Sequence, residues 1–326
     1  MKFTNLNRKE LYIDIGSSNT RIHSSEKELF NEPTCLAYHK GTDSVVAIGK
    51  KALSLLGKAP SSIEIGFPVQ YGAVANTKYF ELFLSTVINK IIPEENFKKL
   101  IFGLSGKVSS MSSLSPAKKN LMKELLKKVG FSSVELIDSA YAAGLTICNG
   151  NKNQLNDMCI IDIGAQKTEI AVFSVNELVS SKSFKWGGIK LTEALQKIVR
   201  TNNQCVVGWH LAEEAKKQVG SFGNHKSKFA LQGKDLISQS SKTIVFNSED
   251  VKQEFTDLLN ELLDSFQIFI STLPSETAVS VLDRGIFLTG GGSMLHGIDE
   301  VIRKRLKCDV FISDNPIKDV VFGLTL

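Results

Sequence analysis

The fold of this chain is decided by Ile160-Ile161-Asp162-Ile163-Gly164-Ala165-Gln166-Lys167-Thr168-Glu169, a short apolar strand that runs into Asp, Gly and small polar residues. The same pattern occurs about 150 residues earlier, at Leu11-Tyr12-Ile13-Asp14-Ile15-Gly16-Ser17-Ser18-Asn19-Thr20. Repetition on this scale indicates a duplicated structural unit. The two copies therefore predict an α/β protein of two similar halves, with a phosphate site between them.

Both Asp turns, and a third Gly-rich turn at Leu288–Ser293, have the composition of phosphate-binding loops. Glycine accepts positive φ and lets the backbone approach a ligand, and successive N–H groups form a concavity that suits an anion. Asp14 and Asp162 end their strands, where a carboxylate can hold a hydrated Mg²⁺. The side chains that can donate hydrogen bonds to phosphate are Ser17, Ser18, Asn19 and Thr168.

The composition is that of an ordinary globular protein. The chain has 326 residues, which is long enough for two sizeable domains. Of these residues 42% are hydrophobic and 22% are charged, as in an ordinary globular protein. Its first ten residues lack the apolar core of a signal peptide, and it has no apolar run of about 18 residues. Five scattered cysteines without C-x-x-C spacing favour the reducing cytoplasm over a disulfide framework or a zinc site.

Charge and histidine content exclude two further classes. The net charge of +5 is mild and spread along the chain, and no motif of aromatic and basic residues points to nucleic acid. The lysine pairs are expected on solvated faces, although they would also suit an anionic membrane surface. The five dispersed histidines are interpreted as ordinary surface or core residues rather than metal ligands.

The division into halves follows from the repeat. We expect a first half at residues 1–148 with a small inserted subdomain at about 31–75, and a second half at 149–326 with an inserted subdomain at about 189–247. The asparagine- and lysine-rich stretch 149–157 is the expected link.

Local patterns predict the main elements. Apolar spacing predicts core-facing helices at Thr77–Ile92 and Ser248–Leu273. A buried strand is expected at Leu100–Leu104, followed by a mobile serine-rich loop at Ser109–Ser115. Asp138 and Ser139 precede a helix, where either residue would cap well. A helix is also expected at Leu295–Leu306.

Taken together, these motifs resemble those of the bacterial actins of the MreB/Mbl type over almost the whole chain. Asp14–Thr20 resembles D-L-G-T-A-N-T, and Asn31–Thr34 resembles N-E-P-S. Ala212–Gly220 resembles A-E-R-I-K-x-E-I-G, and Asp283–Ser293 resembles E-R-G-I-x-L-T-G-G-G-A. The run Val46–Val74 is similar to the family's first small subdomain.

The resemblance implies an actin-like fold with four subdomains around an ATP–Mg²⁺ cleft, and head-to-tail assembly into filaments on the inner membrane. It implies magnesium ligation by Asp14 and Asp162, with Glu213 and Lys216 beside the ribose and base. The implied nucleotide-binding residues are Asp14, Gly16, Ser17, Ser18, Asn19, Asp162, Gly164, Ala165, Gln166, Lys167, Thr168, Gly187, Gly188, Glu213, Lys216, Gly290, Gly291, Gly292 and Ser293.

The chain departs from the family where hydrolysis is carried out. The family's E-E-P-x-A-A-A is here Asp138–Gly144, so that Ser139 replaces the Glu that orients the attacking water. Serine is a far poorer base, and Asp138 is one position away. Asp138, Ser139 and Thr168 are the catalytic candidates. The second turn has also lost two glycines, and Lys167 either contacts phosphate or faces solvent. We expect slow or lost hydrolysis.

Three interpretations remain open at the sequence level. The first is a cytoskeletal filament protomer that supports cell shape or wall synthesis, alone or with an MreB-type paralogue. The second is an active ATPase whose turnover drives filament dynamics, and the third is a co-polymerising or regulatory paralogue that forms no filament alone. A sugar kinase or chaperone is disfavoured. Membrane contact would use Ile91, Ile92 and Phe97, unless these residues pack inward.

Overall fold

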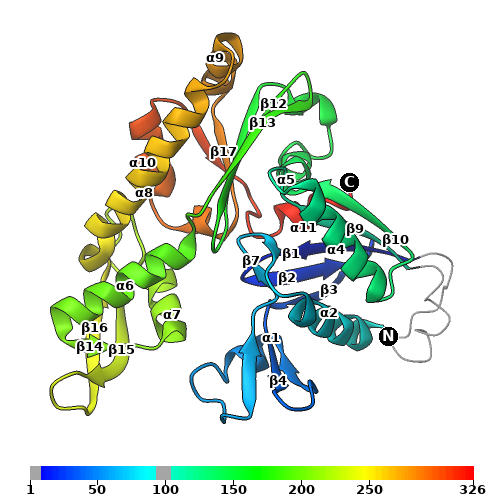
Figure 1. The fold of residues 1–326 in the computed structure, drawn as a ribbon. Coiled ribbons are helices and arrows are strands. Elements are labelled where there is room, and N and C mark those ends of the chain that lie inside the picture. Colours follow the sequence, from blue (N-terminus) through cyan, green and yellow to red (C-terminus); the bar gives the residue numbers. More distant parts are fainter. Residues whose placement is uncertain (1–8, 93–103) are drawn as a thin grey trace. The chain divides into compact units, whose positions relative to one another are not determined.

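A computed structural model of the protein describes residues 9–92 and 104–326. The chain forms two compact units (Figure 1). Unit 1 takes the chain as far as Gly150 together with Lys318–Leu326, and unit 2 is Asn151–Ile317.

The C-terminal residues 318–326 belong to unit 1, whereas the expected division assigned them to the second half. Helix α11 (Asp319–Gly323) packs against α5 (Ser139–Ile147). A Cβ added to Gly323 would lie 1.7 Å from the carbonyl oxygen of Ala142, and Thr146 Oγ1 donates to the Asp319 carbonyl at 2.7 Å. These close contacts hold the end of the chain in unit 1.

Unit 1 contains a five-stranded mixed sheet with the order β10-β9-β1-β2-β3. Strands β1, β2 and β3 are antiparallel neighbours, whereas β9 and β10 run parallel to β1. The strands are β1 (Lys9–Ile15), β2 (Asn19–His23), β3 (Glu28–Pro33), β9 (Leu104–Ser110) and β10 (Ser133–Asp138).

Alternation along β1 gives the sheet two apolar faces. Leu11, Ile13 and Ile15 belong to a core with buried residues of α2 (Thr77–Ile91) and α4 (Pro116–Lys128). Tyr12 belongs to a separate cluster with residues of α5 and α11 on the other face. Asp14 shares the alternation of Tyr12, so it lies at the end of β1 on the face that α5 and α11 cover.

A small sheet completes unit 1, with the order β5-β4-β6 and the short helix α1 (Gly49–Leu53) beside it. Its strands are β4 (Leu36–His39), β5 (Val45–Ile48) and β6 (Ile63–Gly66), and a two-stranded ribbon of β7 (Val69–Gln70) and β8 (Ala73–Val74) follows. Tyr79 of α2 donates to Glu64 at 2.5 Å and contacts the Tyr38 hydroxyl at 3.1 Å. This polar network joins the small sheet to α2.

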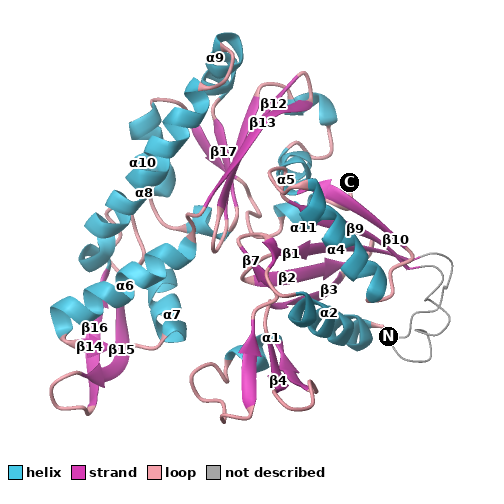
Figure 2. Ribbon diagram, viewed as in Figure 1, coloured by secondary structure: helices cyan, strands magenta, loops and turns pink. Residues whose placement is uncertain are grey.

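Unit 2 repeats the sheet of unit 1. Its order, β13-β12-β11-β17-β18, again combines an antiparallel three-stranded meander with two parallel strands. The strands are β11 (Met158–Ile163), β12 (Thr168–Ser174), β13 (Glu177–Phe184), β17 (Ile286–Thr289) and β18 (Val310–Ile312). The duplication predicted from the two Asp turns is therefore confirmed (Figure 2).

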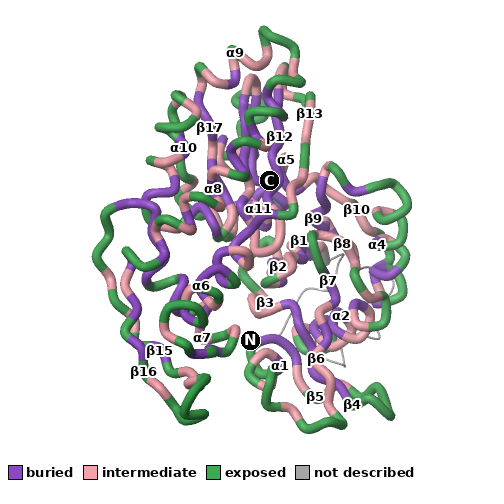
Figure 3. Tube along the Cα trace, turned by 60° about the vertical axis from the view of Figure 1, so that its left-hand side comes forward, coloured by how far each residue is buried: buried purple, intermediate pink, exposed green. Residues whose placement is uncertain are grey.

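Helices line this second sheet, and a three-stranded sheet of order β14-β15-β16 lies within unit 2. The predicted apolar face of α8 (Ser248–Ser271) is buried along the helix, and Val251, Phe255 and Leu259 are fully covered. Figure 3 shows the buried parts of the unit. The remaining elements are α6 (Gly188–Asn203), α7 (Trp209–Val219), α9 (Ser275–Arg284), α10 (Ile298–Leu306), β14 (Cys205–Val206), β15 (Lys228–Asp235), β16 (Ser241–Asn247) and η1 (Lys152–Leu155).

One prediction about unit 1 was wrong in part, and one of the two alternatives left open for Ile91 and Ile92 is excluded. The expected mobile loop at 109–115 begins inside β9, where Ser109 and Ser110 are buried because the strand pairs with both β1 and β10. Most of the strand expected at 100–104 lies outside the described residues. Ile92 is 7% exposed and Ile91 packs against the core, so these two residues face inward rather than toward a membrane. Phe97 lies outside the described residues.

In unit 2 the predicted helix at 295–306 begins later, at Ile298. The preceding Gly291–Met294 forms a short 3₁₀ turn, η2, and Gly297 adopts a φ of 76° that interrupts helical geometry. Helices α9 and α11 were not predicted. Within residues 9–92 and 104–326, no helix is long and apolar enough to cross a membrane.

Candidate functional site

The first Asp turn joins β1 to β2 and is closed by its own backbone. Gly16 N–H donates to the Asn19 carbonyl at 2.9 Å, and a Cβ at Gly16 would lie 2.8 Å from that oxygen. Thr34, which follows β3, stabilises this turn through two hydrogen bonds. Its hydroxyl donates to the Gly16 carbonyl at 2.7 Å, and its N–H donates to the Ser18 carbonyl at 2.8 Å. The N-E-P-T segment therefore shapes the first turn, a role that was not predicted for Thr34.

The carboxylate of Asp14 has a close partner on each oxygen. Ser109 Oγ donates to Oδ1 at 2.8 Å, and the Arg21 guanidinium lies 3.4 Å from Oδ2. Asp14 and Arg21 are directly opposite in the β1–β2 hairpin, and their side chains are only 17% and 15% exposed. Such cross-strand neighbours share one face of a sheet. Neither Arg21 nor Ser109 was predicted as a site residue.

Asp138 and Ser139 lie where β10 runs into α5. Asp138 Oδ1 accepts hydrogen bonds from the N–H groups of Ala140 and Tyr141 at 2.9 and 3.0 Å. The predicted capping role of Asp138 is therefore confirmed, and the cap holds its carboxylate against the helix terminus. Ser139 is 7% exposed.

The second Asp turn joins β11 to β12 with the same closure, because Gly164 N–H donates to the Lys167 carbonyl at 2.9 Å. Thr168 is fully buried and its hydroxyl donates to the Trp186 carbonyl at 2.9 Å. Lys167 Nζ lies 2.9 Å from a carboxylate oxygen of Glu169, which is completely buried. The Lys167 side chain is 16% exposed, so its solvent-facing alternative does not hold.

The N-terminus of α6 rests against the second turn. Gly188 N–H donates to the Gly164 carbonyl and Ile189 N–H to the Ala165 carbonyl, at 3.0 and 2.8 Å. A Cβ at Gly187 would lie 2.6 Å from the Ala165 oxygen, which explains the glycine. Gln166 lies at the tip of this turn, half-buried. A helix N-terminus carries partial positive charge, so the approach of α6 suits an anion beside this turn.

The Gly-rich turn after β17 lies against Asp162. Gly290 has a φ of 79°, and a Cβ there would lie 2.2 Å from Asp162 Oδ1. A Cβ at Gly292 would lie 2.2 Å from the Ile163 side chain, whereas one at Gly291 would meet nothing closer than 3.6 Å. Ser293 Oγ donates to the Gly290 carbonyl at 2.7 Å and fixes the turn.

Glu213 and Lys216 tie α7 to the start of α6. Lys216 Nζ lies 2.6 Å from Glu213 and donates to the Gly188 carbonyl at 3.0 Å. Thr192 donates to the same Glu213 oxygen at 2.5 Å. Burial lowers the pKa of Lys216, although Glu213 opposes that shift. The predicted residues of unit 2 thus gather around Asp162, the α6 terminus and Gly290.

The two halves fit the implied ATP–Mg²⁺ group unequally. The donor set and close-packed glycines of unit 2 suit a phosphate, and Asp162 is a half-buried carboxylate at a strand end. Asp14 does not fit a hydrated magnesium ion, because Ser109 and the Arg21 cation already lie against its two oxygens. Residues 9–92 and 104–326 contain no group of three or more His, Cys, Asp or Glu side chains that could hold a metal.

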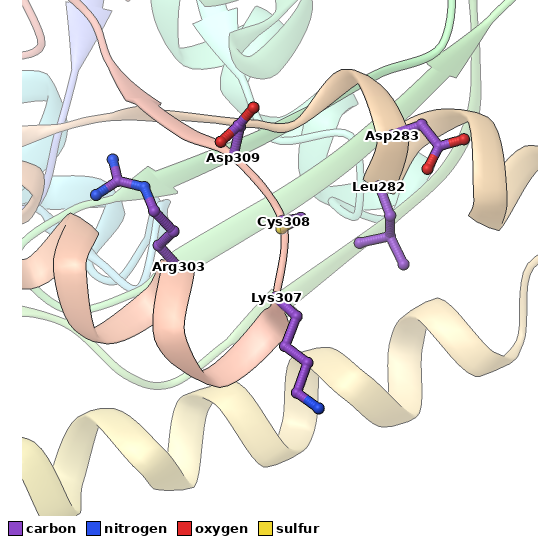
Figure 4. Close-up of a pocket in the computed structure, with 6 residues that line it drawn as sticks. All are labelled: Leu282, Asp283, Arg303, Lys307, Cys308 and Asp309. Atoms are coloured by element: carbon purple, nitrogen blue, oxygen red, sulfur yellow. The ribbon is translucent and has the colours of Figure 1, made fainter.

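An open hollow of about 340 Å³ lies elsewhere in unit 2, between the end of α9 and the start of β18. Its lining residues are Leu282, Asp283, Arg303, Lys307, Cys308 and Asp309. The charged ends of Arg303, Lys307 and Asp283 point away from one another (Figure 4), and Arg303 already donates to the Val310 carbonyl at 3.0 Å. The hollow therefore offers no convergent set of ligand contacts and contains none of the predicted site residues.

Two sheets of the same order, each with an Asp-x-Gly turn after its first strand, define an actin-like fold. Solved structures agree: MreB 5 of Spiroplasma citri bound to AMPPNP has a TM-score of 0.90 at 23% identity, with 97% of this chain and 94% of that chain covered. A MamK double helical filament has a TM-score of 0.78 at 20% identity, with 98% of each chain covered.

The family follows from the sequence comparisons. The model of the MreB/Mbl protein family matches residues 8–326, so this chain belongs to that family. It is 27% identical to the cell shape-determining protein Mbl of Bacillus subtilis, over 97% of this chain and 94% of the relative. It is 26% identical to the cell shape-determining protein MreB of Escherichia coli, over 99% and 94%.

Proposed function

We propose that this chain is a nucleotide-binding protomer of a bacterial cytoskeletal filament that supports cell shape or cell-wall synthesis, and that its ATP hydrolysis is slow or lost. The observation that carries the proposal is the repeated Asp turn, closed by the same backbone hydrogen bond at the same point of both sheets. The relatives named cell shape-determining proteins and the MamK filament support the cytoskeletal part.

The proposed nucleotide contacts lie on both units. The N–H groups and hydroxyls of Gly16–Asn19 and the second turn would bind phosphate oxygens, with Gly187 and Gly188 allowing close approach. Asp162 would hold the magnesium ion, which when bound draws charge from the phosphates. Glu213 and Lys216 would flank the ribose and base. The AMPPNP- and ADP-bound MreB 5 structures support nucleotide binding.

Slow hydrolysis is proposed from the state of the three catalytic candidates. Asp138 accepts two helix N–H groups, so its carboxylate is engaged as a cap. The Thr168 hydroxyl donates to Trp186 and is buried. Ser139 is the third candidate, and its hydroxyl is a far weaker base than a carboxylate. A filament can assemble on nucleotide binding alone, so this defect is compatible with a structural role.

The proposed location is the cytoplasm, with assembly from copies of this chain and with an MreB-type paralogue as an alternative partner. None of the five cysteines forms a disulfide and four are buried, which suits a reducing compartment. Peripheral contact with the inner membrane belongs to the proposal, but Ile91 and Ile92 do not supply it, because both pack inward.

Sedimentation of the purified protein with ATP–Mg²⁺, with ADP–Mg²⁺ and without nucleotide tests this function. Pelleting with ATP alone is expected of a nucleotide-controlled filament, whereas pelleting in all three samples would indicate assembly that is independent of nucleotide. Absence of a pellet at every concentration would contradict a filament of this chain alone and favour the co-polymerising alternative.

A further inference from the structure

The two Asp turns have the same backbone closure, but the residues that face the two Asp side chains carry opposite charges. The residue opposite Asp14 in its hairpin is Arg21, whereas the residue opposite Asp162 is Glu169. In unit 1 the pair is therefore neutral. In unit 2 two carboxylates lie at paired positions, and Lys167 balances the buried one of them. A magnesium ion would be attracted to the second turn rather than the first.

The Arg21 guanidinium is also confined. Its side chain is 15% exposed, Nη1 lies 3.4 Å from Asp14 Oδ2, and Nε is buried with no hydrogen-bond partner among the residues that the structure describes. The other Asp14 oxygen accepts from Ser109 at 2.8 Å. The cation is thus held beside the carboxylate in a partly desolvated position, where it is screened less than a surface lysine.

We propose that Arg21 supplies the fixed positive charge at the first turn that would otherwise come from a divalent cation, so that only the ion at Asp162 makes nucleotide binding by this chain depend on magnesium. The proposal rests on the proposed function. A polyphosphate that approaches Asp14 meets a carboxylate of its own sign, and a cation must lie beside that carboxylate to remove the repulsion. Arg21 fills this role permanently, whereas magnesium would have to be recruited with each nucleotide.

The experiment measures the dissociation constant of a fluorescent ATP analogue, by anisotropy, in excess Mg²⁺ and in EDTA. For the native chain we expect the two values to differ by less than about tenfold, because only the ion at Asp162 is lost. Arg21→Leu leaves Asp14 uncompensated, so its affinity in EDTA is expected to fall at least about tenfold below its affinity in Mg²⁺. Arg21→Lys keeps the charge and is expected to resemble the native chain.

Asp14→Asn distinguishes the proposal from ordinary magnesium ligation. If Asp14 held the ion, Asp14→Asn would weaken binding of the ATP analogue in Mg²⁺. If the proposal is right, the Asp14→Asn protein binds the analogue in EDTA at least as tightly as the native chain does, because the Arg21 charge is then unopposed. Thermal melting would reveal whether Arg21→Leu impairs folding. The Asp14→Asn result does not depend on the folding of Arg21→Leu, so it tests the proposal even if that variant is unstable. Lys118→Leu removes an exposed cation from α4 and serves as the control for net charge.

A native chain that loses tenfold or more of its affinity in EDTA would overturn the proposal while leaving the proposed function intact. Equal magnesium dependence in the native chain and Arg21→Leu, or weaker binding of Asp14→Asn in Mg²⁺ alone, would also overturn it. If the native chain binds the analogue in neither condition, the proposed function fails as well, so the two failures are distinguishable.

Discussion

Gly290→Ala is the sharpest test of the geometry around Asp162. The new methyl would lie 2.2 Å from Asp162 Oδ1 and 2.6 Å from the Ile163 carbonyl oxygen, at a φ of 79°. The left-handed conformation costs an L-residue roughly 1–2 kcal/mol, and overpacking typically costs a further 1–3 kcal/mol. We therefore expect a loss of about 2–5 kcal/mol of stability in unit 2, and displacement of the Asp162 carboxylate.

Gly291→Ala is the matched control, because its methyl would meet nothing closer than 3.6 Å and its φ lies outside the left-handed region. Thermal unfolding compares the two variants, and each kcal/mol corresponds to about 2–4 °C in a domain of this size. Gly290→Ala should melt at least about 4 °C lower and lose ATP affinity, while Gly291→Ala should melt at the native temperature. Equal melting temperatures would refute the placement of Gly290 against Asp162.

Two further predictions concern unit 1. Ser139→Glu restores a carboxylate at the position proposed for water activation, so phosphate release should rise at least about tenfold; Ser139→Gln, of similar size but without the charge, should stay at the native rate, and equal rates would locate the defect in the loop Ala165–Lys167. Burial lowers the pKa of His23 below its ordinary 6.5, so the folded chain binds fewer protons than the unfolded chain as pH falls through 6.5, and stability should fall with it. Urea unfolding between pH 7.5 and 5 should show this loss in the native chain and in the exposed control His39→Gln but a smaller loss in His23→Gln, and an unchanged slope in His23→Gln would contradict it.

Much of the fold could be predicted because it depends on local patterns. The two Asp turns carry their own glycines, and the stripe of α8 follows helical periodicity, so both could be identified without tertiary information. The partner of Asp14 was also readable in principle. Once Gly16 and Asn19 close the turn, antiparallel pairing sets Asp14 opposite Arg21.

What could not be predicted depends on packing between distant segments. The assignment of residues 318–326 to unit 1 follows from the fit of Gly323 against Ala142, which no local pattern indicates. The serine-rich stretch 109–115 was expected to be a loop from composition, yet Ser109 and Ser110 are buried between two neighbouring strands. The roles of Thr34, Ser109 and Trp186 likewise require the folded sheet to bring them to the turns.

The most direct test of the central claim follows filament assembly and phosphate release in one sample after ATP–Mg²⁺ is added, by light scattering and a phosphate-binding reporter. A nucleotide-bound filament with slow or lost hydrolysis should reach its scattering plateau while less than about one tenth of the protomers have released phosphate. An activation barrier for hydrolysis about 1.4 kcal/mol higher than the barrier for assembly would already make hydrolysis tenfold slower. Phosphate release in step with assembly would contradict slow hydrolysis, and the absence of scattering at every concentration would contradict a filament formed by this chain alone.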